Sequence, residues 1–201
     1  ISNALLHKGN KYKLCTDLKG FYPSVNHHHV YQTMIELKFS PKVASLITKL
    51  VTLNGETPQG TPSSPIITNL VFLPYDKKLD DFCVKHNITY TRYVDDLMFS
   101  SQQDFKEISL DILAIVNDSP FLTHHGKTFY TAGKAESVGV EIGQNNIRPT
   151  KEFKQKLVTE VEMPLVNKKR MKGLMGYQER IKKVNGYSKS KVFKIQEVKS
   201  K

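Results

Sequence analysis

Acidic residues interrupt two apolar, strand-forming runs of the chain, and this feature constrains the fold more than any other. Asp17 lies at the end of the run 14–18, and Asp95 and Asp96 lie inside the run 93–99. A carboxylate in an apolar environment is unfavourable unless water or a cation compensates its charge. The sequence therefore predicts two strands whose acidic ends reach solvent or a bound cation.

The same acids suggest a chemical role if the two strands are neighbours. Their carboxylates would then converge, and hard oxygen ligands of this kind suit Mg²⁺. A pair of such ions can stabilise both the attacking and the leaving oxygen of a phosphoryl transfer. An adjacent pair such as Asp95 and Asp96 is also typical of a polar hairpin turn, so the pair alone leaves both interpretations open.

The rest of the pattern interleaves strands and helices. β-branched and aromatic residues predict strands at residues 12–18, two strands within 88–100, and strands at 121–130 and 137–142, the last pairing with Ile147. Apolar periodicity and capping residues predict helices at 28–39, 41–51, 64–83, 105–116, 150–161 and 168–183. Pro74 should kink the third helix or end it early. The order indicates an α+β fold in which helices pack against an antiparallel sheet.

Positive charge is concentrated in the last quarter of the chain. Residues 1–150 carry a net charge of +1 and residues 151–201 carry +10. This asymmetry favours a nucleic-acid partner, although a solvated lysine-rich helix pair has the same composition. The chain has no run of about 18 apolar residues, so we expect no membrane span. Its two cysteines, Cys15 and Cys83, fit neither a disulfide framework nor a zinc site, which favours a reducing cytoplasm.

A loop of small residues, 57–65, precedes the third helix. Such a loop lets a nucleotide or a nucleic-acid backbone approach closely, and the helix N-terminus behind it favours phosphate. Phe21 and Tyr22 follow Asp17 closely and are either core residues or a flat wall against a sugar or base.

In order and spacing, these segments resemble the palm of reverse transcriptases. The resemblance rests on three motifs, Asp-Leu-Lys-Gly-Phe-Tyr at 17–22, Gln-Gly-Thr-Pro-Ser-Ser-Pro at 59–65 and Tyr-Val-Asp-Asp at 93–96. Residues 126–128, 138–149 and 173–185 are similar to the family's lysine motif, primer-gripping hairpin and thumb. Residues 3–7, Asn-Ala-Leu-Leu-His, match the NAxxH signature of retron enzymes, whereas residues 137–139 depart from their second signature, VTG.

The resemblance implies roles for individual residues. Asp17, Asp95 and Asp96, with the Leu18 carbonyl, are expected to bind two Mg²⁺ ions, for which Mn²⁺ can substitute. The residues expected at the incoming nucleotide are Phe21, Tyr22, Gln59, Gly60 and Lys127. Tyr22 is expected to exclude a 2′-hydroxyl, and Lys127 to neutralise or protonate the leaving pyrophosphate. The residues expected at RNA or DNA are Asn3, His7, Lys168, Lys169, Arg170, Lys172, Tyr177 and Arg180.

Other interpretations of some of these residues stay open. Lys127 is otherwise a solvated lysine. Asn3 and His7 otherwise make local hydrogen bonds, and Tyr177 otherwise anchors its helix.

The resemblance also implies an architecture and an activity. We expect a palm at residues 1–149 with a remnant of fingers, and a basic helical thumb at 150–201. The fingers are expected to be largely absent, because only 16 residues precede Asp17. The implied activity is RNA-directed DNA synthesis of the retron type, which makes branched RNA–DNA and serves anti-phage defence in the bacterial cytoplasm. The implied partners are a cognate structured non-coding RNA, the RNA–DNA product, dNTPs and an effector or toxin protein.

Two alternatives remain at this point. One is another defence-associated or group II intron-like reverse transcriptase. The other is a nucleic-acid-binding scaffold whose polymerase site is idle.

Overall fold

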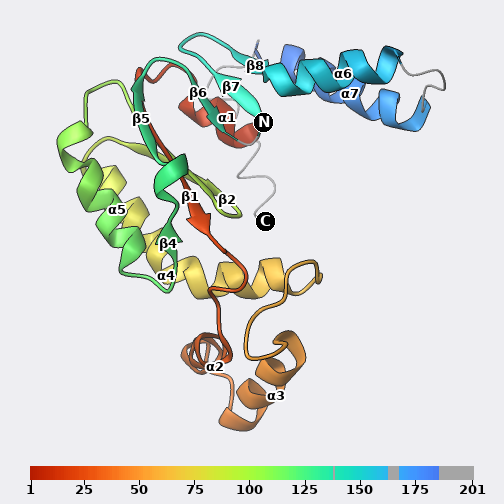
Figure 1. Cartoon of the computed structure of the whole chain (residues 1–201). Coiled ribbons are helices and arrows are strands. Elements are labelled where there is room, and N and C mark those ends of the chain that lie inside the picture. The colour runs from red at the N-terminus through yellow and green to blue at the C-terminus, as the bar shows by residue number, and fades with distance from the viewer. Residues whose placement is uncertain (138, 163–167, 186–201) are drawn as a thin grey trace. The chain divides into compact units, whose positions relative to one another are not determined.

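The computed structural model describes residues 1–137, 139–162 and 168–185, in which helices and strands interleave (Figure 1). Its α-helices are α1 (Ser2–His7), α2 (His27–Glu36), α3 (Pro41–Val51), α4 (Ser64–Lys85), α5 (Ser109–Asn117), α6 (Lys151–Glu162) and α7 (Lys168–Val184). Its strands are β1 (Tyr12–Lys19), β2 (Thr89–Tyr93), β3 (Asp96–Ser101), β4 (Leu122–Thr123), β5 (Phe129–Ala132), β6 (Ala135–Ser137), β7 (Val140–Ile142) and β8 (Ile147–Pro149). Two short 3₁₀ turns complete the description, η1 (Lys106–Ile108) and η2 (His125–Lys127).

The chain divides into two compact units. Unit 1 contains residues 1–15, 98–104 and the described residues from Tyr130 onward, and unit 2 contains residues 16–97 and 105–129. The division passes through β1 and β3, so each of these strands contributes residues to both units. This division by compactness does not test the expected boundary between palm and thumb after residue 149, which stays a prediction.

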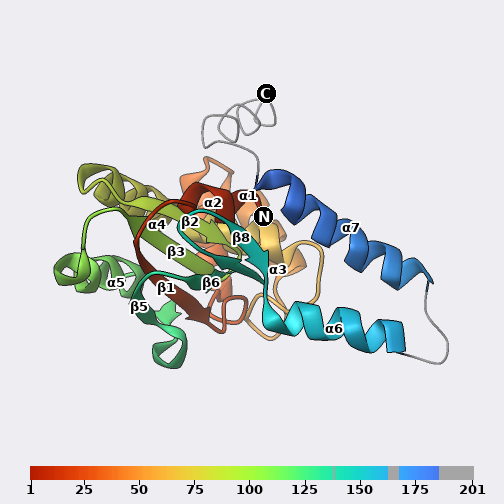
Figure 2. The same ribbon diagram turned by 90° about the horizontal axis from the view of Figure 1, so that it is seen from above.

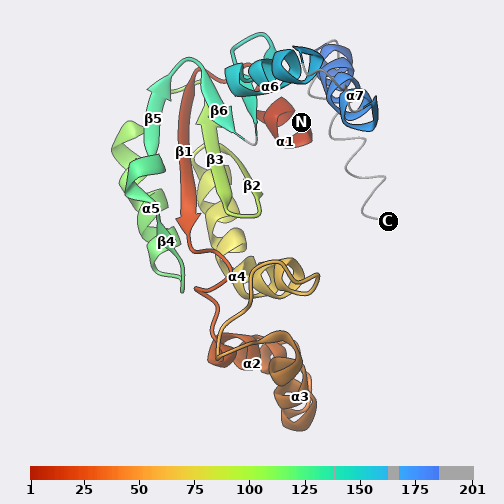
Figure 3. The same ribbon diagram turned by 45° about the vertical axis from the view of Figure 1, so that its right-hand side comes forward.

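Unit 2 contains the predicted catalytic residues and the four helices α2 to α5. The main sheet has the strand order β2-β3-β1-β4, and β5 also pairs with β1. β4 is antiparallel to β1, with Leu18 opposite Thr123. In this unit α4 packs against β2, and α5 packs against α4 and β4 (Figure 3). The rings of Phe21 and Phe72 both contact the buried Phe121, so an aromatic core joins the turn after β1 to α4.

Unit 1 is built around the small antiparallel sheet β6-β7-β8. Ile142 pairs with Ile147 across the turn between β7 and β8, and both are fully buried. The side chain of Asn185, directly after α7, bonds both the amide and the carbonyl of Ile147, at 2.8 and 2.9 Å. Lys8, directly after α1, donates to the Asn185 carbonyl at 2.8 Å, so the ends of α1 and α7 lie together (Figure 2).

Most predicted elements are present, and the α+β class with an antiparallel sheet is confirmed. Ser40 caps α3 as its sequence predicts, accepting a hydrogen bond from the Val43 amide. Pro74 does not end its helix early, because α4 continues through it to Lys85, and a kink at Pro74, the other predicted outcome, stays a prediction.

Two predicted strands differ from the structure. The predicted strand 121–130 is interrupted by η2, which separates β4 from β5. The predicted strand 137–142 is divided between β6 and β7, and Gly139, between them, has a φ of 72°. Val138, which the sequence placed in the primer-gripping hairpin, lies outside the described residues. None of the described helices combines the length and the apolar character that crossing a membrane requires.

Candidate active site

A backbone hydrogen bond brings two of the three predicted acids together. Asp17 lies near the end of β1, and the amide of the next residue, Leu18, donates to the Asp95 carbonyl at 2.9 Å. Asp95 lies in the tight turn between β2 and β3, and Asp96 begins β3. All three aspartates are partly exposed, so their carboxylates remain hydrated and accessible to a cation.

The turn that carries Asp95 contains a residue in the left-handed backbone region. Val94 has a φ of 59°, which a β-branched residue normally avoids. Backbone strain of this kind persists only where the surrounding structure enforces it, and it is concentrated at functional sites. Here the guanidinium of Arg92 donates to the Val94 carbonyl at 2.7 Å and helps to hold the turn.

Lys127 forms a hydrogen-bonded ion pair with the Asp17 carboxylate. Its Nζ is 3.0 Å from Asp17 Oδ2, while 60% of the lysine side chain remains exposed. The hydrogen bond from Lys127 and the negative charge of Asp17 raise the pKa of Lys127, and the charges of Asp95 and Asp96 raise it further. The lysine therefore stays protonated beside the three carboxylates.

The η2 turn that carries Lys127 is fixed to β1 by the residue before it and by the residue after it. The His124 amide donates to the Asp17 carbonyl at 2.8 Å. On the other side, the hydroxyls of Thr128 and Thr16 are 2.7 Å apart. These two contacts explain how a residue 110 positions later in the chain reaches the Asp17 carboxylate.

The donor set suits a divalent cation in its chemistry, because three carboxylates and the Leu18 carbonyl offer the hard oxygen atoms that Mg²⁺ prefers. However, among the described residues no three His, Cys, Asp or Glu side chains gather closely enough to hold a metal ion. The Lys127 ammonium instead compensates the charge of Asp17. The chemistry of the residues fits a divalent cation, which would have to compete with Lys127 for the Asp17 carboxylate and draw the three carboxylates closer together.

The loop before α4 is anchored at both ends. The amide and the hydroxyl of Thr57 donate to the Val25 carbonyl at 2.9 and 3.1 Å. The buried hydroxyl of Ser64 donates back to the Pro58 carbonyl at 2.5 Å. The Thr57 bonds tie the start of the predicted nucleotide-binding loop to Val25, three residues after the first motif, and the Ser64 bond closes the loop on itself.

Four residues predicted at the nucleotide lie in these two motifs. Gln59 and Gly60 are exposed in the loop, where Gly60 has a φ of 91° that favours glycine. Phe21 is buried, and its ring contacts Tyr22 edge to face, with centroids 5.4 Å apart. Tyr22 is only partly buried, so Phe21 is a core residue that supports a more exposed tyrosine.

The two predicted RNA contacts in α1 have different environments. His7 is fully buried, and its Nδ1 lies 2.6 Å from the Ser100 hydroxyl. Asn10 donates to the same hydroxyl at 2.7 Å. Asn3 is partly exposed. RNA contact by Asn3 and His7 stays a prediction, and the bond of the buried His7 to Ser100 joins residues 93 positions apart, so it is not the local hydrogen bond of the alternative interpretation.

The predicted nucleic-acid residues of α7 are mostly exposed. Lys169, Arg170, Lys172 and Arg180 are exposed. Lys168 begins α7, and the structure does not describe its side chain. Tyr177 is partly buried against Phe153 of α6, with ring centroids 4.8 Å apart. This packing favours an anchoring role for Tyr177, while the charged residues present a basic surface.

The sequence gives little sign of Arg92, which the structure places among the motifs. Arg92 bonds both carboxylate oxygens of Asp76, and Tyr90 donates to Asp76 at 2.7 Å. The only available signal was a cationic residue two positions before Val94, in a strand that was otherwise expected to pack against a helix.

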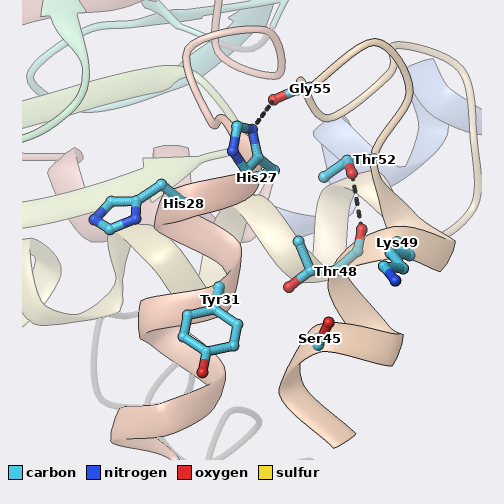
Figure 4. A pocket seen from close by; sticks show the side chains of 8 residues that line it. All are labelled: His27, His28, Tyr31, Ser45, Thr48, Lys49, Thr52 and Gly55. Atoms are coloured by element: carbon cyan, nitrogen blue, oxygen red, sulfur yellow. Dashed lines mark hydrogen bonds between the residues drawn. The ribbon is translucent and has the colours of Figure 1, made fainter. Parts of the chain in front are cut away.

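A separate cavity of about 490 Å³ opens between α2 and α3 (Figure 4). It is lined by His27, His28, Tyr31, Ser45, Thr48, Lys49, Thr52 and Gly55. Its threonine hydroxyls already donate to backbone carbonyls of α3, and none of its lining residues belongs to the three motifs. The cavity is therefore distinct from the carboxylate site.

Comparison with known proteins identifies the relatives of this chain. Residues 1–142 match the family model described as reverse transcriptase (RNA-dependent DNA polymerase). The retron Se72 reverse transcriptase of Salmonella heidelberg is 37% identical over 105 residues, 52% of this chain and 28% of that protein. The retron Ec86 reverse transcriptase of Escherichia coli is 27% identical over 151 residues, 73% of this chain and 47% of that protein. The chain thus spans less than half the length of these relatives.

Solved structures with a similar fold come from more distant proteins. A foamy viral protease-reverse transcriptase in complex with double-stranded DNA has a TM-score of 0.57 at 21% identity, and the match covers 88% of this chain and 29% of that one. An apo telomerase from Candida tropicalis, truncated from its C-terminal domain, has a TM-score of 0.53 at 16% identity. The match covers 74% of this chain and 38% of the telomerase chain. These likenesses concern the fold, and the resemblance to retron-type enzymes is confirmed by the retron relatives. From its motifs, its fold and the match over residues 1–142, the chain belongs to the reverse transcriptase family.

Proposed function

We propose that the protein containing this chain is an RNA-directed DNA polymerase of the retron type. It would copy a structured non-coding RNA into DNA and contribute to anti-phage defence. The observation that carries the proposal is the bond from the Leu18 amide to the Asp95 carbonyl, because it brings the acids of the first and third motifs together. The retron relatives support the subtype.

The proposed site would work through two Mg²⁺ ions held by Asp17, Asp95 and Asp96 with the Leu18 carbonyl. When bound, such ions activate a primer hydroxyl and stabilise the departing pyrophosphate. Tyr22, whose ring packs against the buried Phe21 ring, would contact the sugar of the incoming dNTP and exclude a 2′-hydroxyl.

Two further parts of the site act on the nucleotide. Gln59 and Gly60 would line the nucleotide pocket from a loop that is fixed at both ends. The protonated Lys127 would neutralise the pyrophosphate or donate a proton to it as it leaves.

Helix α7 of the proposed thumb would hold the template and primer. In the proposed division, residues 1–149 form the palm and residues 150–201 form the thumb. The exposed cations of α7 would face the phosphate backbone, and their clustering supports this proposal. The cognate RNA and the RNA–DNA product would be the nucleic-acid partners, and an effector protein in the bacterial cytoplasm would be a further one.

A nucleic-acid-binding scaffold with an idle polymerase site is the second candidate. One observation favours it, namely that the three carboxylates do not gather round a common metal position among the described residues. The two candidates differ in one measurable respect, because only the polymerase incorporates dNTPs.

Primer extension on an RNA template with dNTPs and Mg²⁺ tests the proposal. Three protein samples are compared: the chain alone, the complete product of the gene that encodes it, and the Asp95→Ala/Asp96→Ala variant of whichever of these two is active. We expect synthesis that the double substitution abolishes. RNA binding without synthesis in every sample would support the scaffold instead.

A further inference from the structure

Arg92 joins β2 to α4 through a bidentate ion pair. Its Nε and Nη2 donate to the two carboxylate oxygens of Asp76, at 2.9 and 2.5 Å. Its Nη1 donates to the Asn69 side chain at 2.8 Å, and only 11% of the Arg92 side chain is exposed. The paired, fork-shaped geometry fixes the guanidinium in one orientation.

The same guanidinium holds the turn that carries Asp95. Nη1 also donates to the Val94 carbonyl at 2.7 Å. Val94 is the residue with the left-handed backbone, and its carbonyl carbon is bonded to the amide nitrogen of Asp95. A rotation of the Val94–Asp95 peptide would therefore break this bond, which means that Arg92 restrains the backbone directly before a predicted metal ligand.

The Arg92 guanidinium lies over two aromatic rings. The guanidinium carbon lies 4.7 Å from the centroid of the Phe72 ring and 5.8 Å from that of Phe21. Such cation–π contacts are strongest where water is excluded. The Phe21 ring in turn packs against Tyr22, the residue predicted to contact the sugar. Arg92 therefore contacts both the turn that carries Asp95 and the ring that supports Tyr22.

The ion pair keeps Arg92 charged in spite of its burial. Burial opposes the charged form, but the hydrogen bonds and the charge of Asp76 outweigh it and raise the pKa of Arg92. Burial and the nearby Asp76 carboxylate also raise the pKa of Tyr90, which therefore remains a neutral donor to Asp76. The network thus has a fixed set of donors and acceptors across the neutral pH range.

We infer that Arg92 is a positioning residue that holds the Val94–Asp95 turn in a fixed position relative to the packed rings of Phe21 and Tyr22. This role rests on the proposed polymerase function and goes beyond it. It means that Arg92, a residue outside the three motifs, aligns the acidic turn with the tyrosine that would contact the sugar. Arginine is required for the role, since a lysine ammonium cannot at once bond both Asp76 oxygens, reach Asn69 and the Val94 carbonyl, and lie over two aromatic rings.

The main variant is Arg92→Lys, which keeps the positive charge and removes the bidentate hydrogen bonds of the guanidinium to Asp76. Lys78→Gln is the matched control, because Lys78 lies on the same helix as Asp76 and makes a surface ion pair with Asp118 in which both side chains are more than half exposed. Both variants are made in the form of the protein that shows wild-type primer extension. The concentration of active sites is titrated so that the kinetic constants refer to folded enzyme only.

We expect Arg92→Lys to lower kcat/KM for dNTP incorporation about tenfold or more per active site, as expected when charge-assisted hydrogen bonds to a buried group are removed. The preference for dNTP over rNTP, measured as the ratio of their kcat/KM values, should also fall several-fold. The control should leave both quantities within about twofold. Unchanged constants per active site, with only a lower Tm, would show that Arg92 merely stabilises the fold.

Hydrogen exchange supplies a readout that does not depend on polymerase activity. The amides of residues 94–96 should exchange faster in Arg92→Lys than in wild type or in the Lys78→Gln control. If the wild type makes no DNA but this difference is present, the proposed function fails and the restraint by Arg92 stands. Equal exchange in all three proteins would overturn the inference. If Arg92→Lys does not fold, Asp76→Asn weakens the same anchor and should show both effects to a smaller degree.

Discussion

At the scale of single residues, Lys127 determines the charge balance of the carboxylate site. Its ammonium compensates Asp17, which is also a predicted ligand of the metal ions. Lys127→Met should therefore bind Mn²⁺ more tightly, by about two- to fivefold, because the cation no longer displaces an ion pair. The same variant should lose DNA synthesis, because the leaving pyrophosphate has lost its neutralising group. Isothermal titration with Mn²⁺ and primer extension measure the two effects.

Lys127→Arg is the control for this prediction, because it keeps the positive charge beside Asp17 while changing the donor. Its Mn²⁺ affinity should stay close to that of the wild type. Equal or weaker Mn²⁺ binding by Lys127→Met would show that the lysine and the ion do not share a site.

Cys83 shows how burial controls reactivity in the core of unit 2. Burial and the nearby charge of Asp80 raise the pKa of its thiol to about 12, so almost no reactive thiolate is present at neutral pH. We expect iodoacetamide at pH 8 to modify Cys83 only when the protein unfolds. Peptide mass spectrometry of samples labelled with and without guanidinium measures this. Rapid labelling of Cys83 in the native protein would contradict the packing around it.

At the scale of elements, a reciprocal cap begins α2 directly after the first motif. The His29 amide donates to the Asn26 side chain at 3.0 Å, and the Asn26 amide donates to His29 Nδ1 at 3.3 Å. Only neutral His29 can accept this bond. Burial and the charge of His28 lower the pKa of His29 below its ordinary value of about 6.5. The unfolded chain therefore takes up a proton first as the pH falls, and the folded state loses stability over that range.

Substitution of His29 by glutamine should flatten this pH dependence. Glutamine at the same position preserves the reciprocal cap without titrating. The free energy of unfolding in urea, compared at pH 7.5 and pH 5.5, should fall less in His29→Gln than in the wild type. His125→Gln, at an exposed histidine, should leave the difference unchanged. Asn26→Ala should cost about 1 kcal/mol at either pH, because it removes the cap itself.

The elements that local chemistry determines could be predicted from the sequence. Ser40 and Pro41 define the start of α3, and the acidic turn after Tyr93 defines the hairpin of β2 and β3. The effect of Pro74 on its helix does not follow from local sequence, because a proline removes one hydrogen bond but tertiary packing can still retain the helix around it. Apolar content alone also gave no sign that η2 interrupts the strand predicted at 121–130.

The site residues likewise divide into those that a local motif predicts and those that depend on contacts distant in the sequence. The three acids and the glycine of the loop occur in short motifs, so sequence order was enough to nominate them. Arg92 depends on Asp76, 16 residues earlier, and on Asn69, 23 residues earlier, and no periodicity of one strand reports on such partners. The burial of His7 against Ser100 is likewise a long-range contact, which a motif that suggests RNA contact does not reveal.

At the scale of the whole molecule, the uneven distribution of charge sets the expected mode of nucleic-acid binding. Residues 151–201 carry +10 of the total +11, and the described cations of α7 are exposed. Binding through phosphate contacts releases counterions, so affinity should fall steeply with salt. The three variants Lys169→Gln, Arg170→Gln and Lys172→Gln, combined in one protein, test whether α7 supplies these contacts.

The combined α7 variant should bind a primer–template duplex more weakly at low salt. The slope of log K against log salt should become shallower by about 0.9 for each phosphate that the protein no longer neutralises. The matched control combines Lys151→Gln, Lys154→Gln and Lys156→Gln, which removes the same charge from exposed positions of the neighbouring α6. If α7 lies against the duplex, only its own variant changes the slope substantially. Equal changes in both variants would instead mean that the C-terminal charge acts as a diffuse field, and the assignment of α7 as the nucleic-acid-binding helix would then be wrong.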